Sequence, residues 1–395
     1  MRSMIGWTTR VLALAAAGIA SAGAQTSPLV IGGGVSETGV LEDLAAGYRK
    51  GLLLWEEQVN ATGGIGSRAV RLRLLDDASE AIAAGKLYAR LIRDEHAAAL
   101  VGPYGSAASM MASAEAERAG RVIVNGAAAS RGLHKRSPRY VFQAGVPYSA
   151  YGAAVLDIVK AAGYRKVFVA ARDDLVSREM AEATVEAAHR LQLDAGDVEI
   201  FAAGDADFSL QVAKARAAQV DAWIAFGEAR DAAEMVKAFR RLNYAPRLFF
   251  ARGAADPGFI SAVGQDAEFT LAALEYDVRL RTPGNEAFVK AFTAKWGAPP
   301  GASAAEAYAA ATVLGEGLRR AGEDSRKLRE ALAAAAIPTV LGEYKVDPKT
   351  GEQTEMRPAI VQIVKGRPQF VWPTAQTEKR AAAYPQWSER RPMKP

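Results

Sequence analysis

The sequence predicts an α/β protein with two similar lobes, each built from a mostly parallel sheet flanked by helices. Short apolar runs rich in β-branched residues alternate with longer segments of helical periodicity. Such alternation forms a parallel sheet with helices on both faces. The pattern occurs twice, over 29–125 and over 166–251, and a chain of 395 residues is long enough for two domains.

The first run begins with an apolar strand and a helix whose apolar residues recur every three or four positions. VRLRLLD then alternates between apolar and polar residues, as a strand does. A Gly-Pro-Tyr-Gly turn leads into a helix of small residues. The elements expected here are strand 29–33, helix 41–60, strand 70–76, helix 80–95, strand 98–101, a helix from Ser106, and strand 122–125.

The second run repeats the pattern, and a more helical part follows it after Leu271. Two short strands close the fold and lie on either side of the turn DPKTG. Beyond Trp372 the chain is polar and rich in Pro and Arg, so residues 376–395 are expected to form a disordered tail. The expected elements are strand 166–172, helix 178–191, strand 197–203, helix 208–217, strand 222–226, helix 231–242, strand 247–251, helices 285–296, 302–320 and 325–335, and strands 343–346 and 359–364.

The formal net charge of +5 comes from the two ends of the chain. Residues 1–24 carry two arginines and no acid, and 376–395 hold five basic residues against two acidic ones. Residues 25–375 are therefore formally neutral. A nucleic-acid-binding protein carries basic charge on its folded surface, so the charge distribution argues against nucleic acid as a partner.

The N-terminus has the pattern of a cleavable secretory signal. Arg2 and Arg10 precede the apolar run Val11–Ala20, and Ala22-Gly23-Ala24 is an A-x-A cleavage pattern. We expect residues 1–24 to be a signal peptide. The chain has no cysteine, hence no disulfide, no thiolate metal ligand and no lipid-attachment cysteine. We therefore expect a freely soluble periplasmic protein.

Catalytic motifs are absent from the sequence. GxSxG, HExxH and GxxxxGK[ST] do not occur, and the three histidines are scattered. The adjacent pair Asp76-Asp77 could serve as catalytic carboxylates, but its place at a strand end favours turn and cap roles. We expect no catalytic residue, no metal site and no cofactor.

Four motifs occur in an order that resembles a known family. They are NATGGIGSRAVRLRLLDDAS (60–79), LVGPYGSAAS (100–109), VNGAAASRGL (124–133) and EYKVDPKTG (343–351). In this order they resemble the leucine/isoleucine/valine-type substrate-binding proteins of bacterial ABC transporters, and the resemblance covers nearly all of 28–373.

The resemblance implies the type I periplasmic binding fold, in which the chain crosses three times between two lobes. We expect crossings near Gly145–Tyr148, Glu275–Val278 and Glu343–Val346. The N-terminal lobe would be 28–145 plus 278–343, and the C-terminal lobe 146–277 plus 344–375. A small ligand would bind between the lobes and draw them together by a hinge motion.

The resemblance also implies partners. The protein is expected to be a monomer that delivers an amino acid or organic acid to inner-membrane ABC permease subunits. A ligand sensor of the same fold, feeding a signalling partner, is the alternative function.

On the first lobe, the resemblance places ligand contacts in two loops. Ser106 and nearby N–H groups would hold a ligand carboxylate at a helix N-terminus, and Tyr104 would line the mouth. Ser106 could instead serve only as the N-cap of its helix. Ala129 stands where the family has a threonine, so backbone groups of Ala127 and Ala129 would replace the missing hydroxyl.

On the second lobe, the expected contacts depart from the family pattern. Val176-Ser177 replaces a Tyr-Gly pair, so Tyr148 or Tyr151 would supply the aromatic lid. Glu228 stands where leucine-type relatives have a tyrosine, and Arg252 where they have the glutamate that binds the ligand's ammonium.

These replacements leave three alternatives open. Arg252 could hold the carboxylate of an organic or aromatic acid. Glu228 could instead bind the ammonium group of an amino acid. In the third alternative, Glu228 and Arg252 pair with each other across the cleft.

Overall fold

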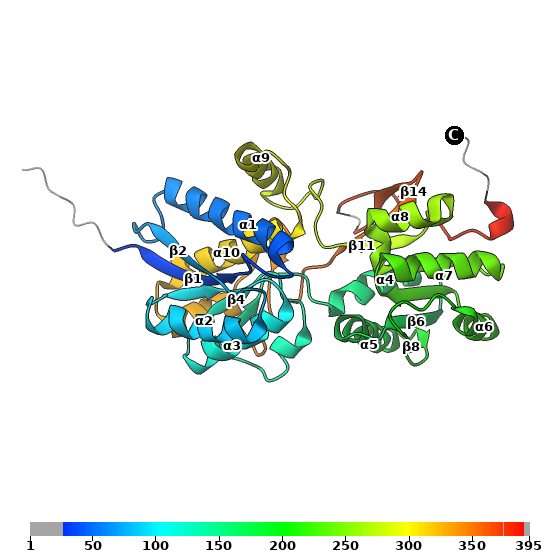
Figure 1. Cartoon of the computed structure of the whole chain (residues 1–395), viewed down its shortest axis with the longest axis horizontal. Helices are drawn as coiled ribbons and strands as arrows, with labels where there is room; N and C mark the ends of the chain where they lie inside the picture. Colours follow the sequence, from blue (N-terminus) through cyan, green and yellow to red (C-terminus); the bar gives the residue numbers. More distant parts are fainter. Residues whose placement is uncertain (1–26, 374, 391–395) are drawn as a thin grey trace, which may run out of the picture.

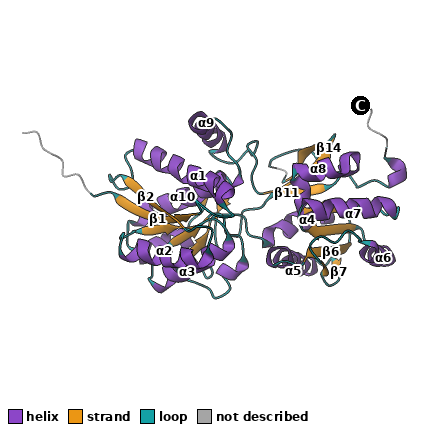
Figure 2. Cartoon of the chain, viewed as in Figure 1, coloured by secondary structure: helices purple, strands orange, loops and turns teal. Residues whose placement is uncertain are grey.

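A computed structural model of the chain describes residues 27–373 and 375–390. The chain forms two α/β lobes, confirming the predicted fold class, and helices flank the strands in both (Figures 1 and 2). No helix in this described part is long and apolar enough to cross a bilayer. The predicted signal peptide, residues 1–24, lies outside the described residues.

The first lobe is built on a five-stranded parallel sheet in the order β2-β1-β3-β4-β5. Its strands are β1 (Leu29–Val35), β2 (Val70–Asp76), β3 (Ala99–Val101), β4 (Ile123–Asn125) and β5 (Val141–Gln143). Apolar side chains on both faces of the central strands are buried, as a parallel sheet covered on both sides requires.

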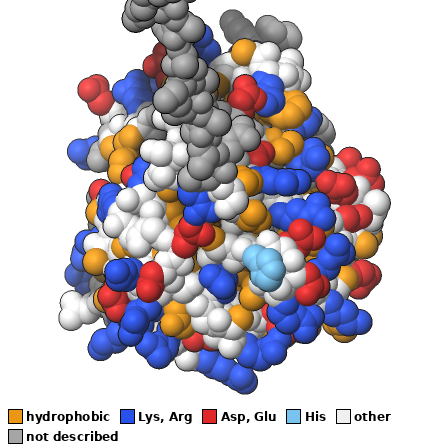
Figure 3. Space-filling model, turned by 90° about the vertical axis from the view of Figure 1, so that its left-hand side faces the viewer, with side chains coloured by type: hydrophobic (Ala, Val, Ile, Leu, Met, Phe, Trp, Pro, Cys, Tyr) orange, Lys and Arg blue, Asp and Glu red, His pale blue; other side chains and the backbone are white. Residues whose placement is uncertain are grey.

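Two pairs of helices cover the sheet of the first lobe. α1 (Glu42–Ala61) and α10 (Ala302–Ala321) pack together on one face, and α2 (Ala81–Arg93) and α3 (Ser106–Arg118) on the other (Figure 1). The lobe is completed by α9 (Asn285–Trp296), α11 (Ser325–Ala333) and the hairpin β12 (Ile337–Thr339) with β13 (Gly342–Tyr344). Lys and Arg side chains are interspersed with Asp and Glu over its outer end (Figure 3).

The second lobe has a mixed sheet in the order β15-β14-β11-β10-β9-β6-β7, with β8 also pairing with β6. The strands up to β11 are parallel, and β14 and β15 are antiparallel to their neighbours. The strands are β6 (Lys166–Arg172), β7 (Asp194–Ala195), β8 (Glu199–Phe201), β9 (Ala222–Phe226), β10 (Leu248–Ala251), β11 (Leu271–Leu274), β14 (Ala359–Val364) and β15 (Arg367–Trp372).

Helices cover both faces of this second sheet. α4 (Ser149–Ala161) and α5 (Leu175–Arg190) pack on one face. On the other face lie α6 (Ser209–Ala217), α7 (Ala229–Arg241) and the short α8 (Pro257–Val263). The parallel strands end at the edge that faces the first lobe, so the loops that follow β9, β10 and β11 lie between the lobes (Figure 1).

The chain passes between the lobes after β5, after β11 and ahead of β14. The third passage differs from the expected position at Glu343–Val346. The segment after β13 turns back on itself and stays on the first lobe, where the Gln143 N–H donates to the Gly351 carbonyl at 3.0 Å. The Gln353 N–H also donates to the Gln143 side chain. A strand pattern alone does not show which sheet a strand joins, so this path could not be predicted.

The C-terminal segment 375–390 packs against the second lobe. Tyr384 is buried, and its ring meets Phe249 edge to face at 5.7 Å between centroids. The indole N–H of Trp387 donates to the Tyr244 carbonyl at 2.7 Å. These contacts anchor the segment beside β10 and α7.

The prediction of a disordered tail over 376–395 is therefore wrong for 376–390. The segment is polar and rich in Pro and Arg, but it also contains Tyr384 and Trp387. Packing of these two aromatic side chains against the second lobe offsets the conformational entropy that is lost when the segment is ordered. Residues 391–395 lie outside the described part.

Candidate functional site

A cavity of ≈ 580 Å³ lies between the lobes, at the carboxyl ends of β9, β10 and β11. That edge of an open α/β sheet is where ligands bind, and the volume suits a small molecule. Ala302, at the start of α10, contributes from the first lobe. From the second lobe the lining residues are Tyr151, Gly227, Glu228, Ala229, Arg230, Arg252, Gly253, Asp256, Ala273, Leu274, Glu275 and Tyr276.

Arg252 is the first residue of a short 3₁₀ helix, η2 (Arg252–Ala255), that follows β10 directly. Its side chain lines the cavity and is partly buried. Within residues 27–373 and 375–390 the guanidinium forms no hydrogen bond and no ion pair. Its charge acts on the nearby hydroxyls of Tyr104, Tyr148 and Tyr151. The cavity therefore contains a cation whose charge is not neutralised by a direct partner.

Gly253 sets the position of Arg252. A Cβ atom at Gly253 would lie 2.2 Å from the carbonyl carbon of Glu228, so only glycine allows η2 to approach the start of α7 this closely. Two cavity-lining loops are thereby held together, one after β9 and one after β10.

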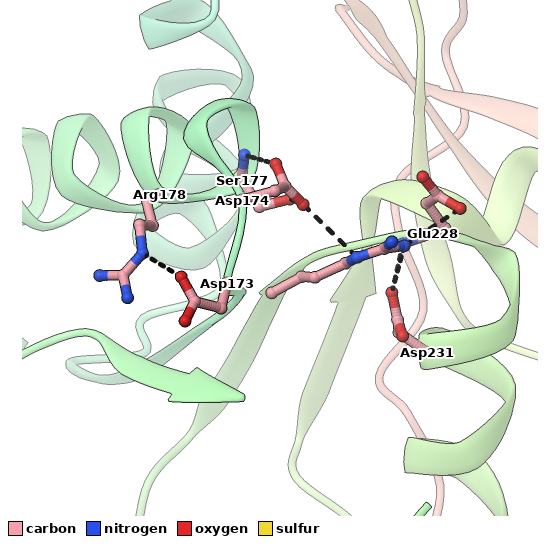
Figure 4. A network of polar contacts seen from close by, with 7 residues as sticks. Asp173, Asp174, Ser177, Arg178, Glu228 and Asp231 are labelled. Atoms are coloured by element: carbon pink, nitrogen blue, oxygen red, sulfur yellow. Dashed lines mark hydrogen bonds and ion pairs between the residues drawn. The ribbon is translucent and has the colours of Figure 1, made fainter. Parts of the chain in front are cut away.

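Glu228 lies in the same cavity but has a different partner. It is the N-cap of α7 and forms a capping box with Asp231. Its carboxylate pairs with the Arg172 guanidinium at 3.1 Å. Arg172 ends β6 and also lies 3.6 Å from the carboxylate of Asp174 and 3.7 Å from that of Asp231 (Figure 4).

The expected alternative in which Glu228 pairs with Arg252 is therefore wrong, because Arg172 is the counter-ion of Glu228. Arg172 was not among the residues predicted from the sequence. Its position as the last residue of a buried strand in the second lobe is the signal that could have indicated it.

Two further acidic residues near Arg252 were also missed. Glu275 follows β11 and lines the cavity, and the Tyr151 hydroxyl donates a hydrogen bond to its carboxylate. Glu306, on α10 of the first lobe, lies close enough to Glu275 for their charges to interact. Burial raises the pKa of Glu306 well above its ordinary value, and the negative charge of Glu275 raises it further.

A sequence signal existed for each acid. Glu275 is the first residue of an expected chain crossing, and Glu306 is a lone acid in an alanine-rich stretch, SAAEAYAA. In such a helix an isolated charge on the buried face needs a partner, which the sequence could not identify.

The predicted first-lobe residues lie around α3, outside the lining of the cavity. Ser106 is the first helical residue, and Gly105, at φ +90°, is the N-cap, so the N-cap role predicted for Ser106 is wrong. The Ser106 side chain accepts a hydrogen bond from the Ser130 N–H at 3.4 Å and lies close to the Tyr148 hydroxyl. Tyr104 packs edge to face on Tyr48.

The backbone groups proposed to replace the missing threonine are partly occupied. The Ala127 carbonyl accepts from the Gly105 N–H at 2.9 Å, and the Ala129 carbonyl accepts from the Tyr148 N–H at 3.0 Å. Tyr148 thus contacts the first-lobe loops, and its hydroxyl also lies close enough to Arg252 to interact with the charge of the guanidinium. In the part of the chain that is described, no group of three or more potential metal ligands occurs.

Two α/β lobes with a polar cavity at their facing strand ends define a ligand-binding protein. A family model described as "Periplasmic binding protein" matches residues 28–368, and the chain belongs to this family. The resemblance to substrate-binding proteins of ABC transporters and the type I fold are thereby confirmed. As a member of this family the protein is a ligand-binding transport component and not an enzyme.

Individual relatives differ in what they bind. The chain is 26% identical over 344 residues to a leucine-, isoleucine-, valine-, threonine- and alanine-binding protein of Pseudomonas aeruginosa, covering 85% of this chain and 90% of that protein. A putative branched-chain amino acid ABC transporter from Rhodospirillum rubrum superposes with a TM-score of 0.78 at 23% identity, over 87% and 100% of the chains. A solute-binding protein of R. palustris in complex with benzoate gives 0.64 at 22% identity, over 91% and 98%.

Proposed function

We propose that this protein is the substrate-binding component of an ABC importer that captures a small carboxylate-bearing solute, an amino acid or an organic or aromatic acid. Arg252 carries this proposal, because it is a cation in the interlobe cavity without a direct partner among the residues that the structure describes. A guanidinium left unpaired on lobe closure would be costly, whereas a ligand carboxylate can pair with it in a bidentate manner.

The residues around Arg252 complete the proposed site. Tyr148 and Tyr104 lie close enough to feel its charge, and the N-terminus of α3 next to Ser106 has N–H groups without helical carbonyl partners. On closure these groups would meet the carboxylate from the first lobe, with the backbone of Ala127 and Ala129 beside them. Glu228, neutralised by Arg172, would line the wall of the cavity.

The cellular setting follows from the same proposal. The protein would be exported by its predicted signal peptide, bind its solute in the periplasm as a monomer and deliver it to inner-membrane permease subunits. No observation on the described chain and no comparison favours the sensor function.

A thermal-shift screen tests the proposal. The amino acids and a series of aliphatic and aromatic carboxylates are compared at equal concentration. A ligand present at about 100 times its Kd stabilises the folded state by about 2.7 kcal/mol, so one of these classes should raise the Tm clearly. If no carboxylate raises the Tm, or if amines without a carboxylate raise it equally, the proposal is wrong.

A further inference from the structure

Glu179, in the second turn of α5, is bonded to the first lobe and not to its own. Its carboxylate accepts a hydrogen bond from the Ser130 hydroxyl at 2.8 Å and another from the Arg131 N–H. Among the described residues it forms no other hydrogen bond and no ion pair. Seven positions further along the same helix, Glu186 pairs with the Arg131 guanidinium at 3.2 Å. The helix α5 is therefore attached to the first lobe at two points.

The two attachments differ in strength. Ser130 is buried and Glu179 is partly buried, so the hydrogen bonds to this carboxylate form where little water competes for it. In the Arg131–Glu186 pair both side chains are about half exposed, and an exposed ion pair is screened by solvent and contributes little. Glu179 is therefore the residue on which the attachment of the lobes at this point depends.

The attachment lies across the cavity from the chain crossings. The neighbouring strands of the second sheet follow the order β14-β11-β10-β9-β6. Two crossings meet this sheet at the end of β11 and the start of β14, and the crossing after β5 leads into α4, which packs against β14. The helix α5 follows β6, at the other end of the row, and the loops after β9, β10 and β11 line the cavity between them. The lobes are therefore joined on both sides of the cavity, by the chain on one side and by Glu179 on the other.

The residues that Glu179 holds belong to the loop on the first-lobe side of the proposed binding site. The Ser130 N–H donates to the Ser106 side chain at 3.4 Å, next to the N-terminus of α3. One residue earlier, the Ala129 carbonyl accepts a hydrogen bond from the Tyr148 N–H at 3.0 Å. A carboxylate of the second lobe thus fixes the first-lobe loop that contacts Ser106.

We propose that Glu179 is a positioning residue of the binding site, which holds the loop 129–131 from the second lobe and so keeps the lobes in a binding-competent arrangement before a ligand arrives. Its effect on affinity rests on the proposed function, whereas its effect on the lobe arrangement does not. The contacts of Glu179 persist in the complex, so they act by raising the population of unliganded protein that can bind. Without them the lobes separate further on this side, and the apparent Kd rises as the competent population falls.

Distance measurements between two spin labels test the lobe arrangement without any ligand. The chain has no cysteine, so labels can be attached through Lys135→Cys in the first lobe and Arg190→Cys at the end of α5, both at exposed positions. Double electron–electron resonance then gives the distribution of distances between the lobes. Glu179→Ala should shift this distribution to longer distances and broaden it. Glu182→Ala, at an exposed position of the same helix, is the matched control and should leave it unchanged.

Calorimetry with the most stabilising ligand of the thermal-shift screen tests the positioning role. Glu179→Ala should bind this ligand about tenfold more weakly, and the bound ligand should restore the wild-type distance distribution. Glu179→Gln retains an oxygen that can accept from the Arg131 N–H, so it should remain close to wild type in both measurements. A role confined to the stability of α5 would lower the resistance to urea and leave the distances between the lobes unchanged.

The possible failures are distinguishable. If unliganded Glu179→Ala gives the wild-type distances, or if Glu182→Ala broadens them equally, the inference is wrong and the proposed function stands. If the distances change but the affinity does not, Glu179 joins the lobes without positioning the site, which also overturns the inference. If no carboxylate binds, the proposed function and the positioning role fail together, and the distances still show whether Glu179 joins the lobes. Ser130→Ala removes one of the two bonds from the first lobe and takes the place of Glu179→Ala if that variant does not fold.

Discussion

At the scale of single residues, two arginines at strand ends of the second lobe, Arg172 after β6 and Arg252 after β10, differ in what surrounds them. Arg172 lies within 4 Å of the carboxylates of Asp174, Glu228 and Asp231, and these balance its charge. Arg252 has no such partner among the described residues. The sequence indicated Arg252 and Glu228 as candidates, but only the structure shows that Arg172 neutralises Glu228. Such pairings depend on side-chain geometry, which spacing along the chain does not encode.

Arg252→Ala should weaken the binding of a carboxylate ligand by more than about tenfold, because a hydrogen bond to a charged group contributes roughly 1.5–3 kcal/mol. Calorimetry with the ligand found by thermal shift measures the effect. Arg190→Ala, an exposed position at the end of α5, is the control for the loss of one positive charge. If Arg252→Ala binds this ligand with the affinity of the wild-type protein, Arg252 is not part of the binding site.

Glu306 makes the stability of the protein depend on pH. Its folded-state pKa is raised above the ordinary carboxyl value of 4.5. Between the two pKa values the unfolded chain has released the proton while the folded chain retains it, so the free energy of unfolding falls as pH rises through this window. Above the folded-state pKa of Glu306, the free energy of unfolding has lost the whole contribution of this group.

Glu306→Gln should abolish this contribution. The free energy of unfolding of the variant relative to wild type should therefore increase as the pH rises above the ordinary carboxyl pKa of 4.5. Urea unfolding at a series of pH values above this point measures the difference, with Glu330→Gln, at an exposed position of α11, as the matched control. A difference between Glu306→Gln and wild type that does not vary with pH would show that Glu306 is not titrating in this window.

At the scale of elements, most of the fold could be predicted, because strands and helices leave periodic apolar patterns. The strand expected at 29–33 is β1 at Leu29–Val35, and the helix expected at 41–60 is α1 at Glu42–Ala61. The path after β13 and the docking of 375–390 could not be predicted. Both depend on a few tertiary contacts, such as those of Gly351 and Tyr384, which leave no periodic signal.

Gly253→Ala tests the contact between two elements, η2 and the start of α7. The added methyl group would lie 2.2 Å from the Glu228 carbonyl carbon, so backbone must shift. We expect a loss of about 1–3 kcal/mol in the free energy of unfolding, and weaker ligand binding although Arg252 is still present.

Chemical denaturation and calorimetry measure these two effects of Gly253→Ala. Gly196→Ala in the same lobe is the control, since a Cβ atom there has no neighbour within 4 Å. Equal stability and affinity of Gly253→Ala and wild type would show that this close approach does not position Arg252.

At the scale of the whole molecule, three chain crossings and a few side-chain contacts connect the lobes. Glu179 on α5 accepts a hydrogen bond from the Ser130 hydroxyl at 2.8 Å, and Arg131 pairs with Glu186 at 3.2 Å. These contacts join the lobes beside α5, whereas Arg252 faces the cavity that a ligand would fill. A ligand bound between the lobes next to Arg252 would stabilise a closed arrangement.

A crystal structure of the complex with the most stabilising ligand of the thermal-shift screen tests the central claim most directly. The account predicts a ligand enclosed between the lobes, its carboxylate on the Arg252 guanidinium and facing the N-terminus of α3. The lobes should also lie closer together than in the unliganded protein. A ligand bound outside this cavity, or a carboxylate turned away from Arg252, would contradict the account.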